Sequence, residues 1–195
     1  MPLARAGYPA NNTDFLFFGG TAAAADYSKA PRFNMPRSDI ASDTAALTTQ
    51  VLTTVALPLS AGDLVTKIAF KSGATAAGTP TNYWFALYDT AGNLISQTAD
   101  QTTTAWAADT TKDLALATPY LVGTPGVYYA GIMVKATTVP SLIVQQVPVV
   151  ADYHWFTNSP NSFAWTSGSS LAGGAPTTLN AVLASQQYAP IVFLT

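Results

Sequence analysis

Two segments of this chain are apolar at nearly every position, including those where a half-exposed strand would carry polar side chains. Residues 83–88 have the sequence Tyr-Trp-Phe-Ala-Leu-Tyr, and residues 127–134 have the sequence Val-Tyr-Tyr-Ala-Gly-Ile-Met-Val. An antiparallel strand with one face in water alternates apolar and polar residues. Both faces of these two strands must therefore be covered. The candidate covers are the N-terminal segment, residues 151–185 or an adjacent subunit.

Other segments show the alternation and turn signals of ordinary strands. Residues 64–71 alternate most clearly, and residues 90–93, Thr-Ala-Gly-Asn, are typical of a hairpin turn because glycine accepts positive φ. Short strands at this spacing predict an all-β chain, folded as a jelly-roll-like antiparallel β-sandwich. The expected strands lie at residues 51–57, 64–71, 83–89, 94–99, 112–117, 126–134, 141–150 and 188–195.

The first 46 residues differ from the remainder of the chain. They contain half of the eight basic residues and four of the nine Phe, and they show no regular alternation. We expect an extended N-terminal arm over residues 1–46 and a single sandwich domain over residues 47–195. We expect the arm to anchor the protein to a partner through Phe15, Phe17, Phe18, Arg32, Phe33 and Arg37.

Residues 151–185 are rich in Ser, Asn, Gly and Pro and predict a long loop before the last strand. A structureless loop of this length is uncommon unless it is functional or packs on a neighbour. Aromatic side chains are enriched at protein interfaces, so those in this loop are candidates for contact with a partner protein. A glycan is the less favoured occupant. The side chains concerned are Trp155, Phe156, Phe163 and Trp165.

The two ends of the sandwich domain are expected to meet. Residues 191–194, Ile-Val-Phe-Leu, form an uncharged run that would promote aggregation at a free sheet edge. We therefore expect residues 188–194 to lie close to residues 51–57 and to close one sandwich. Residues 151–185 are then a surface excursion of the same domain.

Charge and cysteine content narrow the possible functions. Only 9% of the residues are charged and the formal net charge is −2, so the basic clusters required by nucleic-acid binding are missing. The chain has no Cys and one His, which removes disulfides, thiolate chemistry and most metal sites. No apolar stretch approaches the ~20 residues that span a bilayer, and no signal core follows the N-terminus. So little charge suits a surface that contacts other subunits.

The sequence offers only weak candidates for a catalytic or metal-binding site. His154 is the only candidate for a Ser-His-Asp triad, but residues 168–172 lack the final glycine of a nucleophile elbow. Asp109 and Asp113 are unconvincing as a glycosidase pair. The oxygen-bearing residues 89–93 are explained by a turn better than by calcium. We expect no enzyme, no metal and no cofactor.

The central part of the sequence carries a family resemblance. Roughly residues 50–145 resemble a β-sandwich module of structural proteins in tailed bacteriophages, including head-associated and minor tail proteins of phages of actinobacteria. No catalytic motif accompanies the resemblance, so no functional residue is carried over. The matching segments are residues 79–89 (Thr-Pro-Thr-Asn-Tyr-Trp-Phe-Ala-Leu-Tyr-Asp), 94–100 (Leu-Ile-Ser-Gln-Thr-Ala-Asp), 104–108 (Thr-Ala-Trp-Ala-Ala), 114–116 (Leu-Ala-Leu), 119–120 (Pro-Tyr) and 126–134 (Gly-Val-Tyr-Tyr-Ala-Gly-Ile-Met-Val).

The resemblance implies a non-enzymatic virion structural protein, made in the bacterial host cytoplasm, that decorates or reinforces the capsid. Its expected partners are major capsid or tail proteins, and it is expected as a homo-oligomer or in many copies per particle, without nucleic-acid or membrane contact. The alternative is a tail-associated module that binds a receptor or a carbohydrate through the loop aromatics. The arm and residues 151–185 lie outside the match and are expected to decide the position on the particle.

Overall fold

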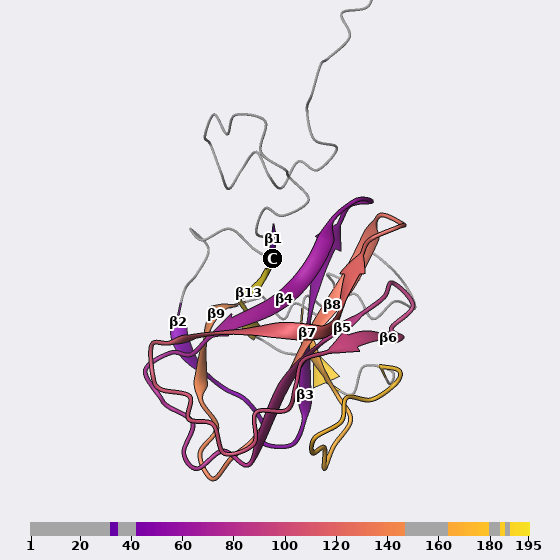
Figure 1. Cartoon of the computed structure of the whole chain (residues 1–195). Helices are drawn as coiled ribbons and strands as arrows, with labels where there is room; N and C mark the ends of the chain where they lie inside the picture. Colours follow the sequence, from indigo (N-terminus) through magenta and orange to yellow (C-terminus); the bar gives the residue numbers. More distant parts are fainter. Residues whose placement is uncertain (1–31, 35–41, 147–163, 180–183, 186–187) are drawn as a thin grey trace, which may run out of the picture.

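The structure, a computed structural model, describes residues 32–34, 42–146, 164–179, 184–185 and 188–195 (Figure 1). All regular secondary structure within these ranges is β, and they contain no helix. Two antiparallel layers pack face to face as a sandwich. The predicted all-β antiparallel sandwich is confirmed at this level.

One layer of the sandwich is a six-stranded sheet with the strand order β11-β10-β3-β8-β5-β6. Every pair of neighbours in it is antiparallel. Two of its interior strands, β8 and β5, are the segments that are apolar on both faces. The bounds are β3 Leu52–Leu59, β5 Asn82–Tyr88, β6 Leu94–Gln97, β8 Gly126–Lys135, β10 Ala164–Ser167 and β11 Ala184–Ser185.

The opposing layer consists of a four-stranded sheet, β1-β13-β4-β7, and a three-stranded sheet, β12-β9-β2. The two sheets adjoin where β12 runs into β13, and there the Ile191 N–H donates to the Ile143 carbonyl over 3.0 Å. The bounds are β1 Arg32–Phe33, β2 Ser42–Ala46, β4 Leu64–Lys71, β7 Thr111–Leu121, β9 Ser141–Gln146, β12 Tyr188–Pro190 and β13 Val192–Leu194.

Strand β7 is longer than the predicted strand at residues 112–117. Its pairing with β4 jumps from Ala115 opposite Lys67 to Tyr120 opposite Val65. The intervening residues bulge away from β4, and the Thr66 N–H donates instead to the carbonyl of Thr195. A register shift of this kind breaks the alternation from which strand limits are inferred.

The expectation that residues 188–195 form a single strand beside residues 51–57 is wrong. The segment makes two strands: β12 pairs with β9, and β13 lies between β1 and β4. Strand β3 pairs with β8 and β10 in the opposite layer. Both ends of the domain nevertheless contribute to one buried cluster, which contains Leu57 and Val192.

Two strands lie within the residues predicted as an arm. Strand β1 pairs with β13, and β2 pairs with β9, so these residues extend the sheets of the second layer. The strand β2 ends at Ala46, where the sequence placed the boundary. Residues 1–31 and 35–41 lie outside the described residues.

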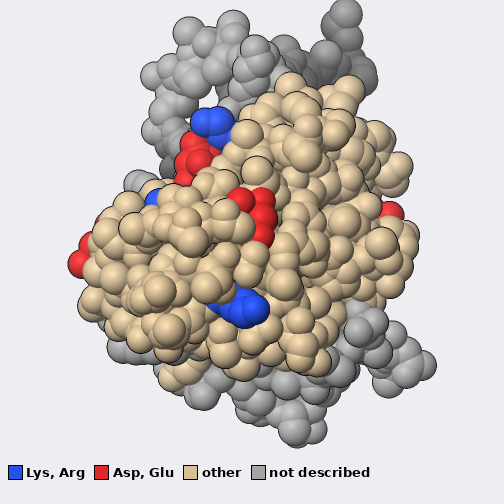
Figure 2. Space-filling view, turned by 60° about the horizontal axis from the view of Figure 1, so that its bottom comes forward, with Lys and Arg blue, Asp and Glu red and all other residues tan. Residues whose placement is uncertain are grey.

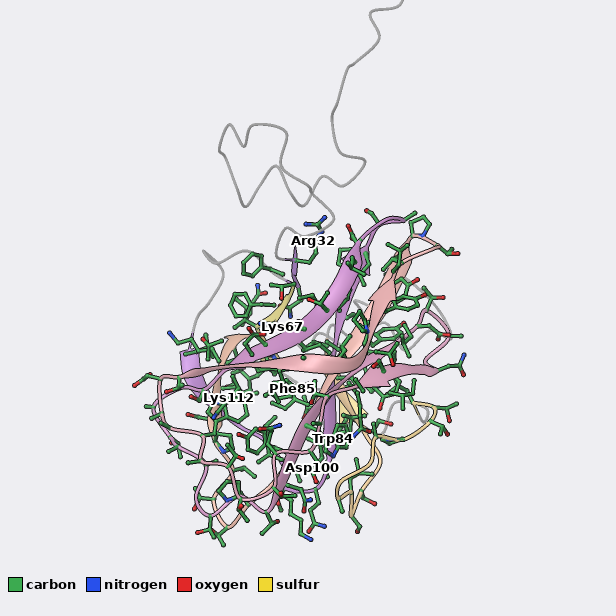
Figure 3. The ribbon with its side chains drawn as sticks, viewed as in Figure 1. Arg32, Lys67, Trp84, Phe85, Asp100 and Lys112 are labelled. Atoms are coloured by element: carbon green, nitrogen blue, oxygen red, sulfur yellow. The ribbon has the colours of Figure 1, made fainter. Side chains whose placement is uncertain are left out.

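The sandwich buries apolar side chains on both sides of the six-stranded sheet. The inner core, between the layers, includes Phe70, Phe85 and Trp106, and the Phe70 and Phe85 rings meet edge to face at 4.9 Å between centroids. A second group, which we call the outer cluster, lies on the other face of the sheet. In Figure 3, Phe85 lies between the layers and Trp84 lies on the side of β10. The outer cluster comprises Leu52, Trp84, Ala86, Tyr88, Tyr129, Met133 and Trp165.

The cover of the outer cluster comes from within residues 151–185. Strand β10 joins the sheet beside β3, and residues 168–179, which we call the strap, run across the outer face. Leu171, Ala175 and Leu179 of the strap pack against the outer cluster. Of the three candidate covers, residues 151–185 are therefore the one that covers the outer cluster. The residues of this range that the structure describes supply the contacts.

Candidate functional site

Arg32 and Phe33, two of the predicted partner contacts, engage their own chain. The Arg32 guanidinium pairs with Asp63 at 2.8 Å, and both side chains are only 8% exposed. The Phe33 ring packs edge to face on Phe193, with 4.7 Å between centroids. Moving Arg32 away would leave the buried Asp63 carboxylate without its counterion, which is costly. The ion pair therefore holds β1 in place.

Asp63 organises the turn between β3 and β4. One of its carboxylate oxygens binds Arg32, and the other accepts the Ser60 N–H over 2.8 Å. Its backbone carbonyl accepts the Val122 N–H over 2.8 Å, which links this turn to the loop between β7 and β8. Arg32, the β3–β4 turn and the β7–β8 loop therefore share one end of the sandwich (Figure 3).

Trp165, a predicted partner or glycan contact, is buried in the outer cluster with 1% of its surface exposed. Its ring meets Tyr129 edge to face at 4.9 Å, and its carbonyl accepts the Thr54 hydroxyl over 3.0 Å. Trp84 and Trp106 are also buried. None of these three indole rings offers a flat surface to a sugar in this structure.

The remaining predicted contact residues lie outside the described residues. They are Phe15, Phe17, Phe18 and Arg37 of the arm and Trp155, Phe156 and Phe163 of the loop. The single histidine, His154, also lies there.

The described surface of the sandwich is nearly uncharged. Among the charged residues whose side chains are described, only Lys67, Asp109 and Asp113 are largely exposed, and the others are half-buried or buried. Lys67 and Asp113 pair with each other at 2.9 Å, which leaves little net field. Figure 2 shows one face, on which small charged patches interrupt an expanse of uncharged residues.

Sequence reasoning did not single out two exposed apolar side chains on this surface. Leu121 at the end of β7 is 63% exposed, and Val127 near the start of β8 is 48% exposed. The other large hydrophobic side chains whose burial the structure describes are half-buried or buried. Leu121 pairs with Leu64 in one layer and Val127 pairs with Pro58 in the other, so each side chain faces outward from its own layer. The alternation of the strands predicts neither exposure, because both residues lie where the sandwich ends.

The turn at residues 89–93 has the chemistry predicted for it. One Asp89 carboxylate oxygen accepts the N–H groups of Ala91 and Asn93, each over 2.8 Å. Partial burial would raise the Asp89 pKa, but hydrogen bonds from Asn93, Ala91 and Gly92 outweigh it and lower this pKa below its ordinary value. Gly92 has a φ of 84°, as a turn glycine requires. The carboxylate is thus occupied by its own turn.

Within the ranges that the structure describes, no cluster of three or more His, Cys, Asp or Glu side chains could hold a metal ion. The same part of the chain has no helix of the length and apolarity that a membrane crossing requires. The sequence matches no protein-family model and no curated protein. The sparsely charged surface and the exposed side chains of Leu121 and Val127 are the features of the described residues that bear on function.

Proposed function

We propose that this chain is a non-enzymatic structural protein of a tailed-bacteriophage particle, which decorates or reinforces the capsid through protein–protein contacts. It would be made in the host cytoplasm and carried in many copies by the virion. The observation that carries the proposal is the nearly uncharged surface of the sandwich, on which Lys67, Asp109 and Asp113 are the largely exposed charges among the described side chains.

A surface of this kind supports stable contact with other proteins. Free soluble domains normally carry interspersed charges that oppose association. The exposed apolar side chains Leu121 and Val127, one on each layer, add area whose burial is favourable by about 25 cal/mol per Å². With so few charges, attachment should depend on burial rather than on ion pairs, and it should resist moderate salt.

We further propose that the sandwich is jelly-roll-like and that the N-terminal arm makes the attachment. Strands β3, β4 and β5 lie alternately in the two layers, and β7, β8 and β9 do so again. This repeated crossing between sheets supports a jelly-roll-like connectivity. Major capsid or tail proteins are the proposed partners.

The carbohydrate-binding alternative has lost support. Three of the four Trp residues are buried in the inner core or the outer cluster. Only Trp155, outside the described residues, is left as a stacking platform. No described aromatic surface favours a sugar over a protein.

Mass spectrometry of purified particles, with heads and tails separated, tests the proposed location. The virus used must be one that encodes this chain. We expect the chain in many copies per particle, and its presence in infected cells but not in particles would refute the proposal.

Two deletions test the arm separately. Removing residues 1–31 leaves every described strand intact, so the protein should stay folded and fail to join particles. Removing residues 1–46 also deletes β1, β2 and the Arg32–Asp63 pair, and should destabilise the sandwich. Normal incorporation of the shorter deletion would refute attachment by the arm while leaving the virion location standing.

A further inference from the structure

An amine, a side-chain amide and a carboxyl group come together at one end of the six-stranded sheet. Asn82 begins β5 and lies directly opposite Lys135, which ends β8. Directly opposed residues of antiparallel strands share a face, with Cβ atoms about 4.5–5.5 Å apart. The Nδ2 atom of Asn82 donates a hydrogen bond to Oδ2 of Asp100. The three side chains therefore occupy one place on the outer face of the sheet.

This group of three side chains is shielded from water by the outer cluster. Asn82, Asp100 and Lys135 are all half-buried, which is unusual for a lysine and an aspartate. The next residues on the same face of β5 and β8 are Trp84 and Met133, and neither has measurable exposure. In Figure 3, Asp100 is drawn close to Trp84 at this end of the sheet.

Gly173 lets the strap close over the group. A Cβ atom at residue 173 would lie 2.9 Å from Oδ2 of Asp100 and 3.8 Å from Nδ2 of Asn82. Any other side chain would therefore push the strap away from the carboxyl. The second carboxyl oxygen of Asp100, Oδ1, is buried and has no hydrogen-bond partner. It is available to carry a proton beside the Asn82 amide.

We propose that Lys135 and Asn82 form an amide bond within the chain, with Asp100 as the proton carrier. The uncharged Nζ atom of Lys135 attacks Cγ of Asn82, and a new nitrogen–carbon bond forms. The Cγ–Nδ2 bond breaks, and Nδ2 leaves as ammonia. Asp100 takes the proton released by Nζ and passes it to Nδ2, to which it is already hydrogen-bonded. The reaction consumes no oxidant, reductant or cofactor.

The fold supplies the positioning that such a reaction requires. Well-oriented reactants reach effective molarities of about 10⁵–10⁸ M, and a placed acid–base group adds roughly 10²–10⁴-fold in rate. The register of β5 and β8 sets the two reactants opposite each other, and a lysine side chain is long enough for its amine to reach the opposing amide carbon. The bond would tie together two strands inside the sheet. The proposal does not depend on the function proposed above.

The intact mass of the folded natural protein tests this cross-link. The cross-linked chain weighs one ammonia less than its sequence, and chymotryptic digestion should yield a branched peptide that joins Lys135 to Asn82. Lys135→Arg keeps the positive charge but cannot form the bond, so it should have its full sequence mass. Asp100→Asn keeps the shape of the carboxyl group and should slow the reaction at least about hundredfold.

The matched control is Lys67→Arg, because Lys67 is largely exposed and its amine pairs with Asp113. This variant should lose ammonia as the natural protein does. A natural protein of full sequence mass would overturn the proposal, and this measurement decides the matter even where a variant fails to fold. Loss of ammonia that persists in Lys135→Arg would also overturn it, because the product would then be a succinimide.

Discussion

The two faces of strand β5 are equally buried, but they are covered by different kinds of structure. Tyr83, Phe85 and Leu87 face the inner core, and Trp84, Ala86 and Tyr88 face the outer cluster, and none has measurable exposure. The inner face is covered by a second hydrogen-bonded layer of strands. The outer face is covered mainly by the strap, which forms no regular ladder with the strands beneath it.

The strap is held by scattered hydrogen bonds and one isolated bridge, Asn93 opposite Thr178, rather than by a continuous ladder. Backbone bonds run from the Leu94 N–H to the Thr177 carbonyl and from the Leu179 N–H to the Gly92 carbonyl, each over 2.8 Å. The Trp84 indole N–H donates to the Ala172 carbonyl. Gln97 donates to the Gly173 carbonyl over 3.0 Å and accepts the Ala175 N–H over 2.7 Å. Irregular chain can thus bury a sheet face if scattered side-chain and backbone partners satisfy its backbone groups.

The difference between the two covers means that equal burial does not give equal local stability. Core strands open only with global unfolding, whereas segments with few ladder hydrogen bonds open locally at lower free energy. We therefore expect the inner core to set the stability of the whole domain and the strap to open on its own. Five predictions test this comparison of the two faces.

The largest effect is expected for Phe85→Ala. The Phe85 ring packs 4.9 Å from Phe70 and 5.9 Å from Trp106, between centroids, in the inner core. Its removal should lower the free energy of unfolding by about 3–5 kcal/mol in urea titrations. A loss below about 1 kcal/mol would mean that the inner core does not dominate stability.

A smaller and local effect is expected for the double variant Leu171→Ala/Leu179→Ala. Both side chains are half-buried against the outer cluster, so their truncation should cost about 1–2 kcal/mol. Hydrogen exchange should accelerate at residues 168–179 while β8 stays protected. The exposed Ser169→Ala is the control, and equal acceleration in β8 would show that the strap and body unfold together.

The next effect is expected for Gln97→Ala, at about 1 kcal/mol. This change removes both side-chain hydrogen bonds from β6 to the strap. Gln101→Ala is the matched control, because its amide donates only to the nearby Ala99 carbonyl. Exchange at Ala175 measures the effect, and an unchanged rate there would contradict this role for Gln97.

The smallest effect at neutral pH is expected for Tyr88→Phe in the outer cluster. The buried Tyr88 hydroxyl has no hydrogen-bond partner, so its loss should change stability by less than about 0.5 kcal/mol. Tyr128→Phe is the comparison from the inner core. The Tyr128 hydroxyl donates to the Thr124 carbonyl over 2.8 Å, so this loss should cost about 1 kcal/mol.

The same two tyrosines should make the stability of the natural protein fall in alkali. Burial raises the pKa of Tyr88, and burial with a hydrogen bond to Tyr120 raises the pKa of Tyr128 to about 12. A pKa raised by folding gives stability that is complete below the unfolded pKa near 10 and is lost as pH rises above it. Each Phe variant should therefore lose less stability than the natural protein between pH 8 and pH 11, as urea titrations would show. A parallel loss in all three proteins would contradict the assignment.

Much of the sandwich could be predicted because its signals are local. Alternation locates β4, and the sequence of residues 83–88 requires two covers, which the structure supplies. The Asp89 turn follows from short-range hydrogen bonding. These features depend on neighbours within a few residues.

What escaped prediction depends on distant partners. Trp165 lies in a stretch rich in Ser and Asn, and only pairing with Thr54 of β3 reveals it as a buried strand residue. Arg32 has the composition of a surface anchor, yet its counterion Asp63 lies 31 positions away. The strap is rich in small residues without a period, so its role could be named only as one of three alternatives.

The position of β13 has a consequence for how the protein is made. This strand, Val192–Leu194, lies between β1 and β4, with Phe193 opposite both Phe33 and Ala69. The four-stranded sheet cannot be completed until residue 194 has been synthesised and has left the ribosome. Folding is then dominated by contacts between distant parts of the chain, which favours slow formation on the millisecond-to-second scale. Until that moment the apolar side chains of the first strands are available to chaperones and to neighbouring nascent chains.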